Sequence, residues 1–266
     1  MNNITFGRSI AGILVIVGLC AARDAHAQAC GRTASTAQFD AFYGALWGCQ
    51  QSRVDDMWSR FHFGKGNWGN GMGYEDPCND ARPLKRTFNA LQLLAYGVTA
   101  TPTCSTSDSN VGLWAYCWSG NAIGLLDSDC DMDSRATTKY GILVSTSTKL
   151  HTSFFYDENV AQRAATIFHE GRHAQGWCQH QGNCARGNCD PNWANGCVGF
   201  GSGSGKGSNA YTVLFLNWFA TTARATWINI SIRNAAITEG NDYLSGAFST
   251  DPCMRMNSEG YTFSTC

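Results

Sequence analysis

Residues 157 to 176 read DENVAQRAATIFHEGRHAQG, and the apolar positions of this stretch follow the spacing of a helix. Apolar side chains that recur at three- and four-residue steps share one helix face, which the core of a protein then covers. The side chains predicted to face the interior are Val160, Ala164, Ile167 and Phe168. Asp157 stands where a capping residue is preferred, and Gly176 can end the helix. The stretch therefore predicts a helix packed against the core.

Two histidines on this helix are four residues apart. Such residues lie one turn above each other on the same face, so His169 and His173 can present their imidazoles to a single ion. Glu170 lies beside that face, where its carboxylate can reach a metal-bound water without being a ligand. Zinc suits two imidazoles and one further ligand, and in catalytic sites it lowers the pKa of a bound water towards neutrality. The pattern predicts a Zn2+ site with Glu170 as general base.

This arrangement is the HExxH motif, and over residues 160 to 180 the sequence resembles the zincin metallopeptidases. The resemblance implies an α+β, predominantly helical fold: a single zincin-like domain with a small sheet and the motif on its active-site helix. It also implies a zinc-dependent metallopeptidase that hydrolyses peptide bonds with a metal-activated water and Glu170 as catalytic base. The expected partner is a protein or peptide substrate.

The third metal ligand depends on the branch of this family. One branch uses a glutamate on a later helix, but Asp190 is the only acidic residue between His173 and Glu239. The metzincin pattern HExxHxxGxxH is met at Gly176, whereas its last histidine comes one residue late, at His180. His180 is therefore the first choice for the third ligand, and Asp190 is the alternative, as in the branches that use aspartate. The metzincin-like and aspzincin-like branches are not resolved.

A competing interpretation assigns no catalysis to these residues. The motif would then be a solvated helix face tied by side-chain pairs, with Arg172 as one of its ion-pair partners. A structural zinc site could form instead from residues of the following segment, namely Cys178, His180, Cys184 and Cys189. The protein would be a disulfide-rich exported binding or structural module with a structural or vestigial metal site.

The first residues have the order of a secretory signal peptide. Arg8 precedes an apolar run over residues 10 to 22, and Ala-His-Ala follows at 25 to 27. We expect cleavage after Ala27, which leaves residues 28 to 266 as the zincin-like metallohydrolase domain. No later stretch approaches the roughly 18 apolar residues of a membrane helix. The sequence predicts a secreted or periplasmic protein without a membrane partner.

Cysteine content and charge agree with export. The chain has 13 cysteines, and removal of Cys20 with the signal peptide leaves an even twelve. In an exported chain this number indicates disulfide bonds, although spacing alone does not give their connectivity. The formal net charge of −1 gives no reason to expect a nucleic-acid partner.

Helices are also expected in other parts of the chain. Apolar spacing predicts helices over residues 35 to 61, with Ser35 as cap, over 82 to 96, and over about 208 to 236. The glycine-rich segment FGKGNWGNGMG, residues 63 to 73, is expected to be a flexible loop rather than a nucleotide site, because no strand precedes it.

Short apolar and aromatic segments between these helices predict a small sheet. They are VGLWAYCW (111 to 118), NAIGLL (121 to 126), YGILVST (140 to 146) and LHTSFFY (150 to 156). The segment from 149 to 156 would line the cleft and pair with an extended substrate. Aspartates alternate through DSDCDMD, residues 127 to 133; a solvated acidic turn is favoured there, and a Ca2+ loop is the weaker alternative.

Three more residues are candidates for the site. His62 and His151 lie in aromatic settings that favour packing or hydrogen bonding, although a strand at His151 would place it near the cleft. Tyr211 could stabilise an oxyanion through its hydroxyl, but a half-buried core tyrosine is the favoured interpretation.

Overall fold

The computed structural model describes residues 29–32, 49–69, 71–96, 104, 111–130, 133–139, 146–174, 208–221 and 230–247. This part of the chain is mostly helical and has one small three-stranded sheet, which confirms the expected proportion of helix and strand. Its helical elements are η1 (Ala29–Gly31), α2 (Gln51–Arg60), α3 (Lys65–Trp68), α4 (Pro83–Tyr96), α5 (Val111–Ala122), α6 (Thr152–Tyr156), α7 (Val160–Ala174), α8 (Ser208–Thr221) and α9 (Ile230–Ala247). Its strands are β1 (Leu125–Ser128), β2 (Ala136–Lys139) and β3 (Ser147–Leu150).

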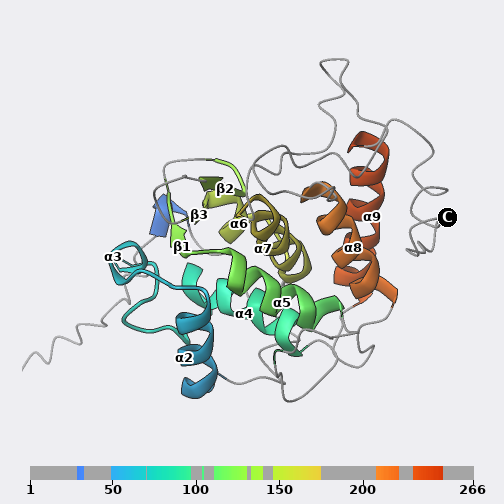
Figure 1. Ribbon diagram of the computed structural model, residues 1–266. Coiled ribbons are helices and arrows are strands. Elements are labelled where there is room, and N and C mark those ends of the chain that lie inside the picture. The colour runs from blue at the N-terminus through green and yellow to red at the C-terminus, as the bar shows by residue number, and fades with distance from the viewer. Residues whose placement is uncertain are drawn as a thin grey trace, which may run out of the picture.

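Helix α7 lies in the middle of the molecule, between the sheet on one side and α8 on the other (Figure 1). It packs against α4, α5 and α8, and it also touches β2. The four apolar side chains predicted to face the interior are all fully buried, which confirms that prediction: Val160, Ala164, Ile167 and Phe168. The helix that carries the two histidines is therefore part of the core.

The N-terminus of α7 is capped by Asn159, not by Asp157 as the sequence suggested. The Asn159 side-chain oxygen accepts hydrogen bonds from the backbone N–H groups of Ala161 (2.9 Å) and Gln162 (3.0 Å). In return, the Gln162 side-chain oxygen accepts a bond of 2.9 Å from the Asn159 N–H. This reciprocal pair is a capping box, which satisfies backbone donors that a helix start leaves free. Asp157 instead accepts two hydrogen bonds from the guanidinium of Arg32.

Helix α5 corrects the prediction of a strand over residues 111 to 118. It packs against α4, α7 and α8, so it is apolar on most of its surface and shows no one-sided pattern. Two close approaches fix its position. A Cβ atom at Gly112 would lie 2.4 Å from the ring of Trp218 in α8, and one at Gly171 in α7 would lie 2.8 Å from Oγ of Ser119. Glycine at both positions lets the three helices pack tightly.

The sheet has the strand order β1-β3-β2, with β1 parallel and β2 antiparallel to β3. Helix α6 covers residues 152 to 156, so the predicted strand over 150 to 156 is wrong beyond Leu150. Because β3 is paired on both sides, the segment from 149 to 156 cannot pair with a substrate. Of the segment over 121 to 126, only residues 125 and 126 are in a strand. Of the segment over 140 to 146, residues 140 to 145 lie outside the described residues.

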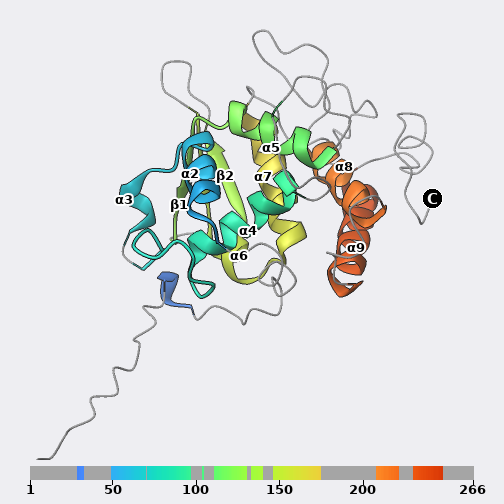
Figure 2. The ribbon, with the colours of Figure 1, turned by 90° about the horizontal axis from the view of Figure 1, so that it is seen from below.

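Three predictions on the remaining elements also need correction. Residues 49 and 50 are not helical, so α2 begins at Gln51, and Ser35 lies outside the described residues. The segment over 63 to 73 is not a free loop, because it contains α3 and the fully buried Trp68. The final long helix is two helices, α8 and α9, which lie side by side on the far side of α7 from the sheet (Figures 1 and 2). The helix predicted over 82 to 96 is confirmed as α4.

The acidic segment is tied to its surroundings rather than solvated throughout. Asp127 is buried in β1 and accepts a hydrogen bond from the side chain of Asn67, and burial raises the pKa of its carboxyl. Asp129 forms an ion pair of 2.8 Å with Lys149. Asp131 lies outside the described residues.

Three disulfide bonds confirm that the chain is crosslinked. They join Cys30 to Cys130, Cys49 to Cys78, and Cys104 to Cys117. The cysteines beyond Cys130 lie outside the described residues. Within the described part of the chain, no helix combines the length and apolar character that crossing a membrane requires.

Candidate metal centre

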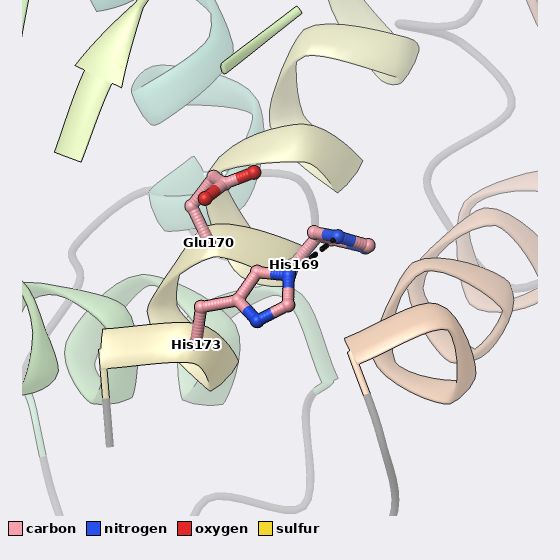
Figure 3. Close-up of side chains that lie close together, drawn as sticks. All are labelled: His169, Glu170 and His173. Carbon is pink, nitrogen blue, oxygen red and sulfur yellow. Dashed lines mark hydrogen bonds between the residues drawn. The ribbon is translucent and has the colours of Figure 1, made fainter. Parts of the chain in front are cut away.

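His169, Glu170 and His173 come together on α7 (Figure 3). One ligand atom from each residue lies within 4.8 Å of the others. The Nε2 atoms of the two imidazoles face each other at 3.1 Å. His169 and Glu170 are buried, with exposed fractions of 6% and 5%, and His173 is partly buried. The structure thus brings together the three residues that the sequence assigned to the site, and it contradicts the interpretation of a solvated face.

The orientation of His169 is set by α8. Its Nδ1 lies 2.9 Å from the hydroxyl oxygen of Thr212, and that hydroxyl can donate its own hydrogen to the backbone oxygen of Ser208 at 3.4 Å. If Thr212 donates to Ser208, its oxygen accepts the Nδ1–H of His169. Nε2 of His169 then carries the lone pair, which is the protonation state that a metal-ligating imidazole needs.

The donor set fits a transition-metal ion. Two nitrogens that bind one tetrahedral zinc ion at about 2.0–2.1 Å lie roughly 3.3 Å apart. The observed separation of 3.1 Å between the two Nε2 atoms is close to this value. Imidazole nitrogens suit zinc, copper, iron and nickel better than calcium or magnesium. The cluster could therefore hold a metal ion of the first group.

Glu170 is held from the sheet side of α7. The hydroxyl of Thr138 in β2 donates a hydrogen bond of 2.6 Å to Oε2 of Glu170. Burial raises the pKa of the Glu170 carboxyl to about 7, although the bond from Thr138 acts in the opposite direction. A nearby cation would also favour the ionised form and lower this pKa. A carboxyl with a pKa near neutrality can take up and release a proton at physiological pH.

Arg172 lies on a different face of α7 from the histidines, and Tyr211 of α8 packs against that face. The Tyr211 ring packs against Phe168 and stacks on Trp118, with centroid distances of 5.0 Å in both cases. The guanidinium of Arg172 lies over the same ring at 5.2 Å. These contacts confirm the half-buried core tyrosine and give no support to an oxyanion role. Arg172 is itself buried, so it is not part of a solvated surface face.

The remaining candidates do not join the cluster or cannot be placed. His151 is fully buried, and its Nε2 lies 2.9 Å from the hydroxyl of Thr137, as the packing interpretation predicted. His62 follows α2 in a left-handed conformation with φ of 51°, which histidine adopts more readily than most residues. His180 and Asp190, the two candidates for a third ligand, lie outside the described residues.

Two residues of the site were missed by reasoning from sequence. Thr138 and Thr212 contact Glu170 and His169 from elements that are distant along the chain. Neither threonine lies in a motif, so no sequence pattern marked it. Comparison of the chain with protein-family models, with curated proteins and with solved structures finds no match.

Proposed function

We propose that this protein is a secreted zinc metallopeptidase of the zincin type. The observation that carries the proposal is the convergence of the His169 and His173 Nε2 atoms, 3.1 Å apart, beside the Glu170 carboxylate. Two imidazoles and an adjacent carboxylate are the residues that metal-assisted hydrolysis needs from one helix. The disulfide bonds and the signal-like first residues support export.

The residues of α7 would have different roles in hydrolysis. His169 and His173 would hold the zinc ion, and His180 or Asp190 would complete the set. When bound, zinc acidifies a water molecule and polarises the carbonyl of the substrate. Glu170 would accept the proton of that water on Oε1, since Oε2 is engaged by Thr138. The water oxygen would add to the carbonyl carbon of the substrate. Glu170 would then pass the proton to the amide nitrogen, and the C–N bond would break to release the amine.

Strand β2 is the best candidate for the element that binds the substrate. It pairs with β3 on one side, and within the described strands its other edge has no partner. An extended peptide can add to such an edge through backbone hydrogen bonds. Thr138 places this strand directly beside Glu170, so a peptide on β2 would run past the proposed base. This assignment replaces the segment from 149 to 156.

Exchange of Glu170 for glutamine tests the proposal. Glu170→Gln keeps the size of the side chain but removes the base, so zinc binding should persist while hydrolysis of labelled casein falls at least about 1,000-fold. Glu75→Gln is a matched control, because Glu75 is exposed and outside the cluster. Wild-type rates in purified, zinc-loaded Glu170→Gln would rule out this mechanism.

The third ligand can be identified in the same assay. Our preference from the sequence is His180, with Asp190 as the alternative. Alanine at the true ligand should lower zinc affinity and hydrolysis together, whereas alanine at the other position should leave zinc affinity unchanged. Unchanged zinc affinity in both single variants would mean that another residue completes the site.

A further inference from the structure

We propose that Thr148 and Thr138 form a two-hydroxyl relay that fixes the Glu170 carboxylate, which makes Thr138 a positioning residue for the base. The two threonines face each other across β3 and β2, and their hydroxyl oxygens are 2.7 Å apart. Thr138 also reaches Oε2 of Glu170 at 2.6 Å. Three elements thus meet in one short chain of hydrogen bonds, from β3 through β2 to α7.

The direction of the relay follows from the number of hydrogens. A hydroxyl donates one hydrogen bond and can accept two, while an ionised carboxylate only accepts. The Thr138 hydroxyl lies 2.6 Å from Oε2 of Glu170 and 3.5 Å from the backbone oxygen of the same residue. When Glu170 is ionised, Thr138 therefore donates its hydrogen to the closer Oε2, and Thr148 donates to the oxygen of Thr138. Each bond in such a chain polarises the next, so the donation to Glu170 is strengthened by Thr148.

The sheet keeps the relay in register. In the β2–β3 ladder, Thr138 lies opposite Thr148 and Ala136 opposite Leu150. The adjoining Thr137 hydroxyl contacts His151 at 2.9 Å, and Arg135 accepts a backbone bond of 2.9 Å from His151. A slip of one residue would turn the Thr138 side chain to the opposite face of the sheet. The hydroxyl is therefore held at Glu170 by the pairing of the strands.

The relay engages Oε2 of Glu170 and leaves Oε1 available to accept a proton. With Oε2 fixed, the carboxylate cannot rotate without breaking the bond of 2.6 Å from Thr138. Oε1 then has a defined position, and a proton taken up there requires no rearrangement of the two hydroxyls. Partners that orient metal-ligating side chains are commonly worth about 10- to 100-fold in affinity or activity, and we expect an effect of similar size for the base beside the metal. The catalytic part of this inference rests on the proposed function, whereas the orientation of Glu170 does not.

Threonine variants test the relay by structure and by kinetics. Thr138→Val keeps the shape of the side chain and removes the hydroxyl, while Thr138→Ser keeps the hydroxyl. Crystal structures should show the Glu170 carboxylate displaced or split in Thr138→Val and in place in Thr138→Ser. With zinc-loaded protein and labelled casein, kcat should fall about 10-fold or more in Thr138→Val, with KM within about twofold, and serine should restore most of it.

Two further variants keep the test decisive. Thr148→Val should lower kcat less than Thr138→Val does, because Thr138 still donates its hydrogen to Glu170. If Thr138→Val does not fold, Thr148→Val takes its place in the test. Thr87→Val is the matched control: this fully buried threonine donates its hydroxyl hydrogen to Pro83 within α4, and its loss should leave kcat within about twofold.

If the Glu170 carboxylate keeps its position in Thr138→Val, the relay is overturned. If the wild type is active and Thr138→Val has the same kcat, the relay is overturned as well. Loss of zinc in Thr138→Val would also contradict the relay, because it would show a general structural role. If the wild type binds zinc but hydrolyses no peptide, the proposed function fails, and the position of the carboxylate in the three crystal structures still decides the inference.

Discussion

Thr212 shows how one hydroxyl can prepare a histidine for a metal. It lies on α8, one turn after Ser208, and its oxygen is 2.9 Å from Nδ1 of His169. The contact selects the ring orientation and leaves Nε2 directed at His173. A partner of this kind contributes to metal affinity although it never touches the ion.

Replacement of Thr212 by valine should therefore weaken zinc binding. We expect the dissociation constant of zinc to rise about 10- to 100-fold in Thr212→Val, because His169 loses the hydroxyl that lies beside Nδ1 and orients its ring. Thr212→Ser should stay close to the wild type. Competition with a chromophoric chelator measures both values, and equal affinity in the valine and serine variants would show that Thr212 does not orient the ring.

At the scale of elements, a partly buried charged cluster ties α9 to the sheet and to the start of α7. Arg135 precedes β2, and its guanidinium pairs with Glu158, at 2.6 Å, and with Glu239 of α9. The hydroxyl of Thr166 donates a further bond of 3.2 Å to Glu158. Two carboxyl groups thus share one guanidinium in a region where Glu158 is only 3% exposed.

This cluster predicts that stability depends on pH. Burial raises the pKa of Glu158 from 4.5 to about 7; Arg135 opposes this rise and Glu239 adds to it. The folded protein then binds this proton more tightly than the unfolded chain. The stabilisation is complete below about pH 4.5 and is lost as pH rises through 7, by up to about 3 kcal/mol. Urea unfolding from pH 5 to 8 should show this decline. Glu158→Gln should make it shallower, and the raised pKa of Glu170 should account for the part that remains. An equal slope in the variant would refute the assignment.

The elements that could be predicted from sequence are those with a one-sided apolar pattern or a clear boundary. Helix α7 has apolar residues at helical spacing, and α4 begins at Pro83, a residue that suits the first position of a helix. Helix α5 was mistaken for a strand because α4, α7 and α8 bury it on several sides, which removes the contrast between faces. A short apolar run with aromatic residues then resembles a strand as closely as a helix.

At the scale of the whole molecule, the disulfide between Cys30 and Cys130 joins parts of the chain that are 100 residues apart. It fixes the region before α2 to the segment after β1. The bond between Cys104 and Cys117 spans only 13 residues. Because a crosslink restricts the unfolded chain more when it closes a longer loop, the first bond should contribute more to stability.

Removal of each bond by paired serine substitutions tests this difference. Loss of the bond between Cys30 and Cys130 should lower the free energy of unfolding by about 2–5 kcal/mol, and by about 2 kcal/mol more than loss of the bond between Cys104 and Cys117. Denaturant unfolding measures both changes. Equal or reversed effects would show that strain or residual structure, rather than loop length, sets the contribution of these bonds.

The candidate site was predictable only as far as it lies on one helix. His169, Glu170 and His173 are close in sequence, so helical spacing alone brings them together. Thr212 comes from α8 and Thr138 from β2, and their distances along the chain carry no signal of contact. The third ligand could not be predicted with certainty for the same reason. Its identity depends on the path of the chain after Gly176, which no periodic pattern in the sequence reports.

In the proposed function, His169 and His173 hold one zinc ion together. Equilibrium dialysis of the purified protein against zinc, followed by elemental analysis, tests it most directly, with the His169→Ala/His173→Ala double variant as control. We expect about one tightly bound zinc ion per chain in the wild type and none in the double variant. Less than about half an equivalent in the wild type, or equal zinc in both proteins, would contradict it.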